Sequence, residues 1–413
     1  MEYDLIVIGG GLAGAALAKP LAEAGLHVLV LERETVFKDR VRGEAMLGWG
    51  VTEAAMLGIE TLLRETCGHE VRFLATRIVG LPEAPVRDLV ETTPHRVGWL
   101  NFYHPKMQTI MLRAAEQAGA NVRRGVTVTG LEPGRPVTVM ARQDGGDTLY
   151  RARLVVAADG RDSGCRKWCG FPVHGDPEHV VMAGVLFEGS QAPEDQVQLR
   201  INPPRGSFAL LAPVGQGRFR AYAGVYRQQD QPVHLSGRRA VSDFVAVCVG
   251  AGMPAQWYDG AEVAGPLACF EAADTWVEHP YGDGVVLIGD AAAASDPSWG
   301  CGLSLTLRDV RVLRDLLVAD SDWDRAAHAY AAEHDRYFGA IHRLTDWMRM
   351  IFYDPGPAGT AHRERAFPYL AEDMNRIPDL VGLGPEAPSD GAARRRLFAE
   401  PPVSDTHGTS QEA

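Results

Sequence analysis

Three glycines, Gly9, Gly11 and Gly14, have the spacing G-x-G-x-x-G and follow an apolar run over residues 3–8. An Ala- and Leu-rich run to about Ala24 comes next, so the pattern predicts a strand, a tight turn and a helix. In such a junction the first glycine permits the turn, the second lets the backbone approach a pyrophosphate, and the third lets the helix pack against the strand. Free N–H groups at the helix N-terminus favour phosphate there.

A carboxylate stands where such a unit recognises a ribose. Gly25 ends the expected helix, residues 28–31 form a second apolar strand, and Glu32 follows at its end. An acid at this position accepts a hydrogen bond from a ribose 2′-hydroxyl and disfavours a 2′-phosphate. The unit therefore predicts a site for the ADP half of FAD or NAD, and these residues alone do not choose between the two.

Two later strands also end in polar residues. An apolar strand over 153–158 precedes Asp159-Gly160, which by itself is a common turn sequence. Another apolar strand, over 285–288, precedes Gly289-Asp290, and a D-P-x-x-G-x-G segment over 296–302 leads into a predicted helix over 303–317. A strand end followed by a glycine-bearing helix start is a second junction compatible with phosphate.

Taken together, G-x-G-x-x-G, A-D-G-x-x-S and G-D-A-A-x(4)-D-P-x-x-G-x-G resemble the motifs of the FAD-dependent class A monooxygenases of the para-hydroxybenzoate hydroxylase type. The resemblance covers about residues 1–330. It implies an α/β fold with a Rossmann-type FAD-binding domain, a mixed or antiparallel β-sheet substrate domain and a helical C-terminal part. FAD is then the expected cofactor, with NAD(P)H as a transient electron donor.

The order of the motifs predicts a discontinuous FAD-binding domain over 1–75, 105–175 and 265–330, because the late motif must return to the same cofactor. Residues 76–104 and 176–264 should form the substrate-side sheet domain, with strands over 180–187, 196–201, 207–212 and 219–226. A helical region over 331–400 and a disordered tail over 401–413 complete the prediction.

The resemblance implies FAD contacts from each motif and from the arginine-bearing loop at residues 40–44, where Arg42 is preferred over Arg40. His104 stands where relatives have arginine, so it either contacts the flavin or caps the helix that begins near Pro105. The implied cofactor-binding residues are Gly9, Gly11, Leu12, Ala13, Gly14, Glu32, Arg33, Arg40, Arg42, His104, Asp159, Gly160, Gly289, Asp290, Pro297, Gly300, Gly302 and Leu303.

The implied reaction inserts one oxygen atom of O2, through a flavin C4a-hydroperoxide, into an aromatic or hydrophobic small molecule. The cofactor carries this chemistry, so no catalytic residue is assigned, and Glu44 and His104 are the candidates. Glu44 anchors the substrate, accepts a proton or pairs with Arg42, and the ion pair is the preferred interpretation. Ala293 and Ser304 depart from the His and Asn of many relatives. The candidate substrate pocket consists of Trp49, Trp99, Phe102, Phe208, Tyr222 and Trp299. Trp299 is the preferred member, because its neighbours Pro297 and Gly300 belong to the turn expected beside the flavin.

Several alternatives share this fold. A flavin-dependent halogenase would need a lysine and a W-x-W-x-I-P segment, but no lysine occurs between Lys38 and Lys106 and no segment matches that pattern. A squalene-type alkene epoxidase or a prenyl-chain reductase stays open, because Gly43-Glu44 and residues 302–309 loosely resemble theirs. A two-component enzyme fed by a separate flavin reductase and a non-catalytic flavoprotein also stay open.

Composition narrows the partners further. The 53 acidic and 41 basic residues give a formal charge of −12, which disfavours nucleic acid as a partner. Six scattered cysteines form no C-x-x-C pair, so we expect reduced thiols and no metal. No membrane span or secretory signal is evident, and the expected location is cytoplasmic. Nothing in the sequence indicates an oligomeric state.

Overall fold

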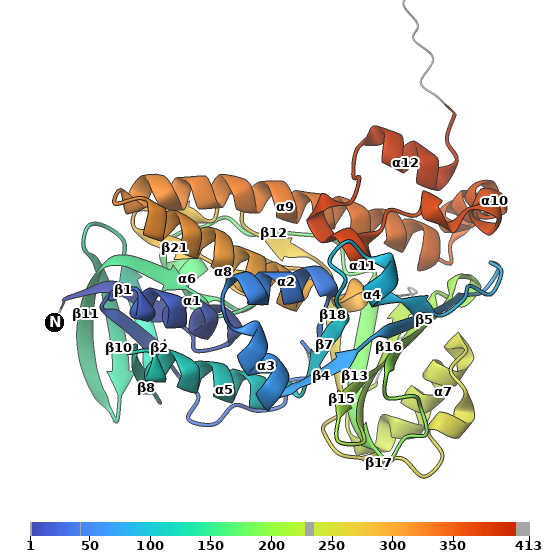
Figure 1. The fold of residues 1–413 in the computed structure, drawn as a ribbon, viewed down its shortest axis with the longest axis horizontal. Helices are drawn as coiled ribbons and strands as arrows, with labels where there is room; N and C mark the ends of the chain where they lie inside the picture. The colour runs from blue at the N-terminus through green and yellow to red at the C-terminus, as the bar shows by residue number, and fades with distance from the viewer. Residues whose placement is uncertain (1, 42, 228–234, 402–413) are drawn as a thin grey trace, which may run out of the picture.

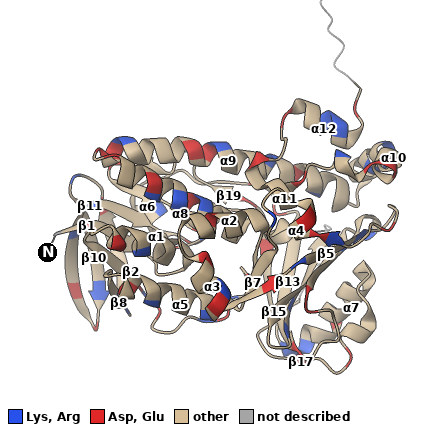
Figure 2. Ribbon diagram, viewed as in Figure 1, with Lys and Arg blue, Asp and Glu red and all other residues tan. Residues whose placement is uncertain are grey.

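Two eight-stranded sheets lie at opposite ends of the molecule in Figure 1, which shows the computed structural model. The structure describes residues 2–41, 43–227 and 235–401. Predicted Arg42 and nearly all of the predicted tail, residues 402–413, lie outside the described residues. Acidic and basic residues are interspersed along both halves of the described chain (Figure 2).

The first sheet is built around β1 (Glu2–Ile8), which lies parallel to β2 (Val28–Glu32) on one side and to β11 (Gly146–Ala157) on the other. The strands β8 (Asn121–Arg124) and β21 (Val285–Leu287) extend this parallel part. The remaining strands pair antiparallel and are β9 (Thr127–Glu132), β10 (Val137–Gln143) and β20 (Tyr281–Gly282). Strand β2 is buried along its whole length, as expected where both faces of a parallel sheet are covered.

The parallel register brings the ends of four strands to one edge of this sheet. Ile8 pairs with Leu31 and Ala157, and Ala157 pairs with Leu287. The segments that follow these strands are the three motifs and Glu32, so they meet along the same edge. In open α/β sheets this carboxyl edge is where ligands bind.

The second sheet is almost entirely antiparallel, with a single parallel pair between β14 and β5. Its strands, in spatial order, are β17 (Glu262–Val263), β13 (Val180–Glu188), β16 (Arg218–Tyr226), β15 (Ser207–Gly215), β14 (Gln196–Asn202), β5 (Phe73–Ile78) and β6 (Arg87–Asp88), and β18 (Ala268–Ala272) also pairs with β13. The four strands predicted between residues 180 and 226 are therefore present. Strand β18 falls in the segment assigned from the sequence to the FAD-binding domain, yet it pairs with this sheet.

Helices pack on both sheets, and one long helix spans the two. The helices α1 (Leu12–Glu23), α5 (His104–Gln117) and α8 (Gly302–Ala319) pack together on the first sheet, and α7 (Val241–Ala251) packs on the second. The long helix α9 (Trp323–Phe352) packs along α8 and extends over both halves of the molecule (Figure 1). The predicted helical C-terminal region is observed as the later part of α9, α10 (Pro357–Glu372), α11 (Leu380–Leu383) and α12 (Gly391–Phe398).

Shorter elements fill the region between the sheets. The small sheets are β3 (Ala45–Met46), β7 (Trp99–Phe102) and β4 (Gly68–Val71), and β12 (His174–Gly175), β19 (Thr275–Trp276) and β22 (Ala293–Ala294). The remaining α-helices are α2 (Gly48–Met56), α3 (Glu60–Thr66), α4 (Leu89–Thr92) and α6 (Gly164–Trp168). Among the helices of the described residues, none combines the length and apolar character that crossing a membrane requires.

Candidate functional site

One cavity of about 570 Å³ lies between the carboxyl edge of the first sheet and the inner face of the second sheet. Its first wall comes from the segments after β1, β2 and β11, and its second wall comes from β13, β15, β16 and β18. The predicted cofactor residues that line it are Gly9, Gly11, Leu12, Ala13, Glu32, Arg33, Arg40, His104, Asp159, Gly160, Asp290, Pro297, Gly300, Gly302 and Leu303.

The glycine turn has the shape that the motif requires. Gly9 has φ +101°, and a Cβ there would lie 2.3 Å from the carbonyl oxygen of Ala158. A Cβ at Gly14 would lie 2.0 Å from the carbonyl oxygen of Gly9, so Gly14 packs α1 against the turn and does not line the cavity. A Cβ at Gly11 would meet only the Gln108 side chain, at 3.5 Å. Helix α1 has no side-chain cap and no acidic residue in its first turn, which suits a phosphate.

Glu32 is held at the cavity by the backbone. Its Oε2 accepts a hydrogen bond from the N–H of Gly10 at 2.7 Å, and its Oε1 accepts one from the N–H of Glu34 at 2.7 Å. The side chain is buried, with 6% of the residue exposed. Each carboxylate oxygen keeps a second lone pair, so the group can also accept from ligand hydroxyls.

Asp159 offers an unused acceptor. Its Oδ2 accepts a hydrogen bond from the N–H of Cys165 at 3.2 Å, whereas its Oδ1 is buried without a partner among the described residues. Buried polar atoms are rarely left unpaired in native proteins. This oxygen therefore fits a hydroxyl group of a cofactor in the cavity.

The turn at Gly289-Asp290 is fixed by a buried acid on α8. The N–H of Gly289 donates to Asp309 Oδ2 at 2.6 Å, and the hydroxyl of Tyr337 donates to Asp309 Oδ1. Burial raises the pKa of Asp309. This clamp places Asp290 at the cavity while Gly289 packs behind it. The sequence analysis missed Asp309, although an acid inside an apolar helical pattern is a signal of a buried partner.

The 296–302 segment also forms a turn beside the cavity. Asp296 Oδ1 accepts a hydrogen bond from the N–H of Ser298 at 2.8 Å, and Gly300 adopts φ +70°. The N–H of Asp296 donates to Asp274 Oδ1. The turn leads into α8, whose first residues, Gly302 and Leu303, line the cavity without a side-chain cap or an acid in the first turn.

Behind this turn lies a cluster of Asp176, Asp274 and His342. His342 Nε2 lies 2.8 Å from Asp176 Oδ2 and 3.8 Å from Asp274 Oδ2. Burial and the nearby charge of Asp296 raise the pKa of Asp274 to about 7. The hydrogen bond with Asp176 raises the pKa of His342. Sequence analysis missed this cluster because its members come from three distant segments.

Glu44 is buried in a charged chain at the second wall. Arg220 lies with Nε 3.0 Å from Glu44 Oε1 and with Nη2 2.8 Å from each carboxylate oxygen of Asp39. The hydroxyl of Tyr222 donates to Glu44 Oε2. The predicted partner of Glu44, Arg42, lies outside the described residues, and within them the ion-pair partner of Glu44 is Arg220.

His104 lines the cavity at the start of α5. Its Nδ1 lies 2.7 Å from the carbonyl oxygen of Gly43, so this nitrogen is the donor. The residue before the helix is Tyr103, and it makes no side-chain cap bond. The interpretation of His104 as a helix cap is therefore wrong. Its side chain instead ties α5 to the loop that carries Glu44.

Of the six predicted pocket aromatics, the cavity is lined by Tyr222 alone. Trp49 packs over Gly384, and Phe208 and Trp299 stack on Tyr353 with ring centroids 4.5 Å and 5.3 Å away. Trp99 and Phe102 are buried in β7. Four of these five side chains lie in the core, and the fifth, Trp299, is partly buried against it, because strand and helix faces that pack on one another bury their aromatics. The second wall consists instead of Met182, Leu210, Ala212, Tyr222 and Phe270.

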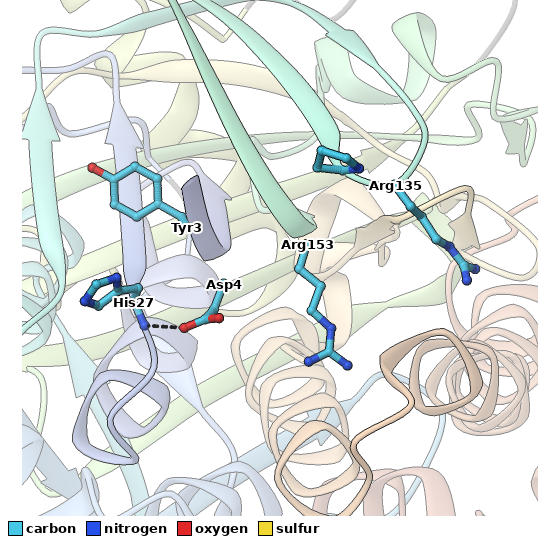
Figure 3. A pocket seen from close by; sticks show the side chains of 6 residues that line it. Tyr3, Asp4, His27, Arg135 and Arg153 are labelled. Carbon is cyan, nitrogen blue, oxygen red and sulfur yellow. Dashed lines mark hydrogen bonds between the residues drawn. The ribbon is translucent and has the colours of Figure 1, made fainter. Parts of the chain in front are cut away.

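A second hollow, of about 490 Å³, lies at the opposite edge of the first sheet (Figure 3). Tyr3 and Asp4, at the start of β1, line it together with His27, Arg135 and Arg153. The Asp4 carboxylate accepts a hydrogen bond from the N–H of His27 at 2.8 Å. None of the predicted cofactor or pocket residues lines this hollow, which lies at the amino end of the central strand.

Comparisons with known proteins agree with this geometry. The family model described as "FAD binding domain" matches residues 2–336. Digeranylgeranylglycerophospholipid reductase 1 of Methanopyrus kandleri is 28% identical over 349 residues, covering 82% of this chain and 86% of that protein. Rifampicin monooxygenase of Streptomyces venezuelae is 27% identical over 407 residues, covering 92% and 80%.

Among solved structures, p-nitrophenol 4-monooxygenase of Pseudomonas putida is similar in fold, with a TM-score of 0.74 and 20% identity over 92% of this chain and 97% of that one. The family match spans both sheets and every motif that lines the cavity. The chain therefore belongs to the FAD-binding-domain family of class A flavoprotein monooxygenases, and it is an FAD-dependent oxidoreductase.

Proposed function

We propose that the protein is a monooxygenase that uses NAD(P)H and O2 to insert one oxygen atom into an aromatic or otherwise hydrophobic small molecule. One observation carries this proposal. A single cavity joins the dinucleotide-binding turn at Gly11 to an apolar wall that includes Met182 and Phe270. A cofactor held on the first wall thus shares a water-poor space with a ligand on the second.

Several residues suit FAD at the first wall. The open N-terminus of α1, the Glu32 carboxylate and the unpaired Oδ1 of Asp159 would hold the pyrophosphate and the hydroxyl groups. The uncapped N-terminus of α8 would stabilise negative charge on the reduced cofactor. Bound FAD would accept two electrons from NAD(P)H and activate O2.

The chain's own contributions are positioning and exclusion of water. The buried chain of Asp39, Arg220, Glu44 and Tyr222 anchors the second wall to the loop beside the cofactor. The overall balance is substrate, O2, NAD(P)H and a proton giving hydroxylated substrate, water and NAD(P)+. No side-chain nucleophile is needed for it.

The test is an anaerobic titration of the FAD-loaded protein with NADPH and with NADH, followed by visible absorbance. We expect flavin bleaching that accelerates when a hydrophobic phenol is present, and uptake of one 18O atom from 18O2 into the product on admission of air. A flavin reduced only by an added reductase would indicate a two-component enzyme. Anaerobic saturation of an alkene without oxygen uptake would overturn the proposal in favour of a prenyl-chain reductase.

A further inference from the structure

The second wall of the cavity has one polar centre. Of the five residues that the second sheet contributes, Met182, Leu210, Ala212 and Phe270 are apolar, and the fifth is Tyr222. Glu44 lines the cavity beside Tyr222, and the Tyr222 hydroxyl donates to the buried Glu44 carboxylate. A ligand on this wall therefore meets an apolar surface with polar atoms at one point.

Both polar groups at that point act as acceptors toward a ligand. A tyrosine has a single hydroxyl hydrogen, and in Tyr222 it is donated to Glu44 Oε2. Burial and the Glu44 charge raise the pKa of Tyr222 well above its ordinary value, so the phenol keeps this hydrogen. An ionised carboxylate can only accept. A ligand group that bonds here must consequently be a donor.

Among the described residues, this wall also lacks a cation for an anionic ligand. Arg220 is fully buried and does not line the cavity, and its guanidinium is shared between the carboxylates of Asp39 and Glu44. Two carboxylates against one guanidinium leave the cluster with excess negative charge. A substrate carboxylate placed here would lose its hydration without gaining a partner.

The cations that do line the cavity come from the first wall. Arg33, Lys38 and Arg40 follow β2, and Arg161 follows Asp159 in the middle motif. Arg161 reaches the edge of β18, where Nη1 and Nη2 approach the carbonyl oxygens of Glu271 and Ala273 at 3.4 Å. An anionic ligand could therefore be held at Arg161 instead, and the experiment below must distinguish that arrangement from binding at Tyr222 and Glu44.

We propose that the substrate site on the second sheet takes an uncharged apolar molecule with a hydroxyl or N–H donor, which bonds to Tyr222 Oη or Glu44, and that it excludes molecules whose carboxylate would face this point. That the bound molecule is a substrate rests on the proposed function. The quantity measured is binding to the oxidised holoprotein, which requires no turnover.

The experiment measures dissociation constants from the visible spectrum of the oxidised, FAD-loaded protein. The probes share one apolar body: 4-ethylphenol is compared with 4-ethylanisole, which lacks the donor, and with 4-ethylbenzoate, in which a carboxylate replaces the hydroxyl. A second set uses 2-naphthol, 2-methoxynaphthalene and 2-naphthoate, so that body size is varied. We expect the uncharged donor to bind at least about tenfold more tightly than both of its partners in at least one set.

Two variants locate the effect. Tyr222→Phe should reduce the preference for the phenol over its methyl ether to within about threefold, because one of the two acceptors is lost. Glu44→Gln should improve binding of the carboxylate probe relative to wild type, because a buried charge is removed. FAD content and the thermal midpoint of each variant verify that it is folded, and Tyr226→Phe, on the same strand but outside the cavity lining, serves as a control that keeps the preference for the donor.

The proposal is overturned if no uncharged donor binds more tightly than its carboxylate partner. It is equally overturned if 4-ethylbenzoate binds wild type as tightly as 4-ethylphenol does and loses that binding in Arg161→Gln, because the anion is then held by the first wall. A preference for donors in a protein whose flavin NAD(P)H never reduces would leave this site in place and refute only the proposed self-sufficient monooxygenase.

Discussion

Asp274 accepts a hydrogen bond from the N–H of Asp296, so it links the turn beside the cavity to His342 on helix α9. The other oxygen of Asp274 lies 3.8 Å from Nε2 of His342, on α9, and the same nitrogen lies 2.8 Å from Asp176. Helix α9 therefore contacts the residues behind the cavity through His342, although the sequence of that helix carries no family motif.

This cluster makes stability depend on pH. Asp274 has its pKa raised to about 7, so the folded state binds a proton that the unfolded state releases near pH 4, and its contribution to stability falls as the pH rises from about 4 to 7. His342 has a raised pKa, so its contribution is complete below about pH 6.5 and is lost as the pH rises through the folded value. Both effects have the same sign.

We therefore expect the thermal midpoint to fall between pH 5.5 and 8, and to fall less in Asp274→Asn, by roughly 1 °C for each kcal/mol removed. The carboxylates that act on Asp274 and His342 are Asp176, Asp296 and Asp346, and the Trp276 ring packs on His342. Calorimetry at the two pH values makes the measurement, with the exposed His27→Ala as control. An identical pH dependence in wild type and Asp274→Asn would refute this account.

Substitutions at Gly11 and Gly14 should affect different properties, namely cofactor affinity at Gly11 and folding stability at Gly14. Gly14→Ala places a methyl group against the Gly9 carbonyl, so the cofactor-free protein should lose about 1–3 kcal/mol of unfolding free energy. Gly11→Ala meets no atom closer than 3.5 Å and points to the open cavity, so stability should be retained while the Kd for FAD rises at least about tenfold. Urea unfolding and FAD titration are the paired measurements, and equal effects in both assays would contradict the assignment.

Arg220→Met should be severely destabilising. Removal of the guanidinium leaves the buried carboxylates of Asp39 and Glu44 without a counter-charge, which costs about 3–5 kcal/mol when one partner of a buried pair is deleted. Arg218→Met on the same strand removes a bond to the exposed Gln216 and should cost less than about 1 kcal/mol. Urea midpoints of the two variants are compared, and a small effect at Arg220 would show that the chain of charges does not brace the wall.

Glu32→Ala should weaken FAD binding by about tenfold or more. The change removes the acceptor for the N–H groups of Gly10 and Glu34 as well as the predicted ribose contact. Fluorescence titration of the cofactor-free protein with FAD measures the effect. Glu23→Ala, which removes only an exposed ion pair with Lys19 on α1, should leave the FAD affinity unchanged.

The sequence by itself determined the parts of the site whose members are neighbours along the chain. The turn at Gly9, Gly11 and Gly14 and the position of Glu32 depend on local backbone geometry and on the pairing of two consecutive strands, so spacing was sufficient. The same holds for the four antiparallel strands between residues 180 and 226, which alternate with turn residues. That these segments bind FAD in the predicted way is a proposal that the experiments above test.

Only the tertiary structure decided which side chains complete the walls. Tyr222 and Glu44 are 178 residues apart in the sequence. Arg220 reaches the Asp39 carboxylate only because the fold places β16 against the loop that carries Asp39. The aromatic residues chosen from the sequence lie mostly in the core, because an aromatic side chain is equally suited to a pocket wall and to a packed interior. Burial depends on which faces meet, and that is a property of the assembled sheets and helices rather than of any one segment.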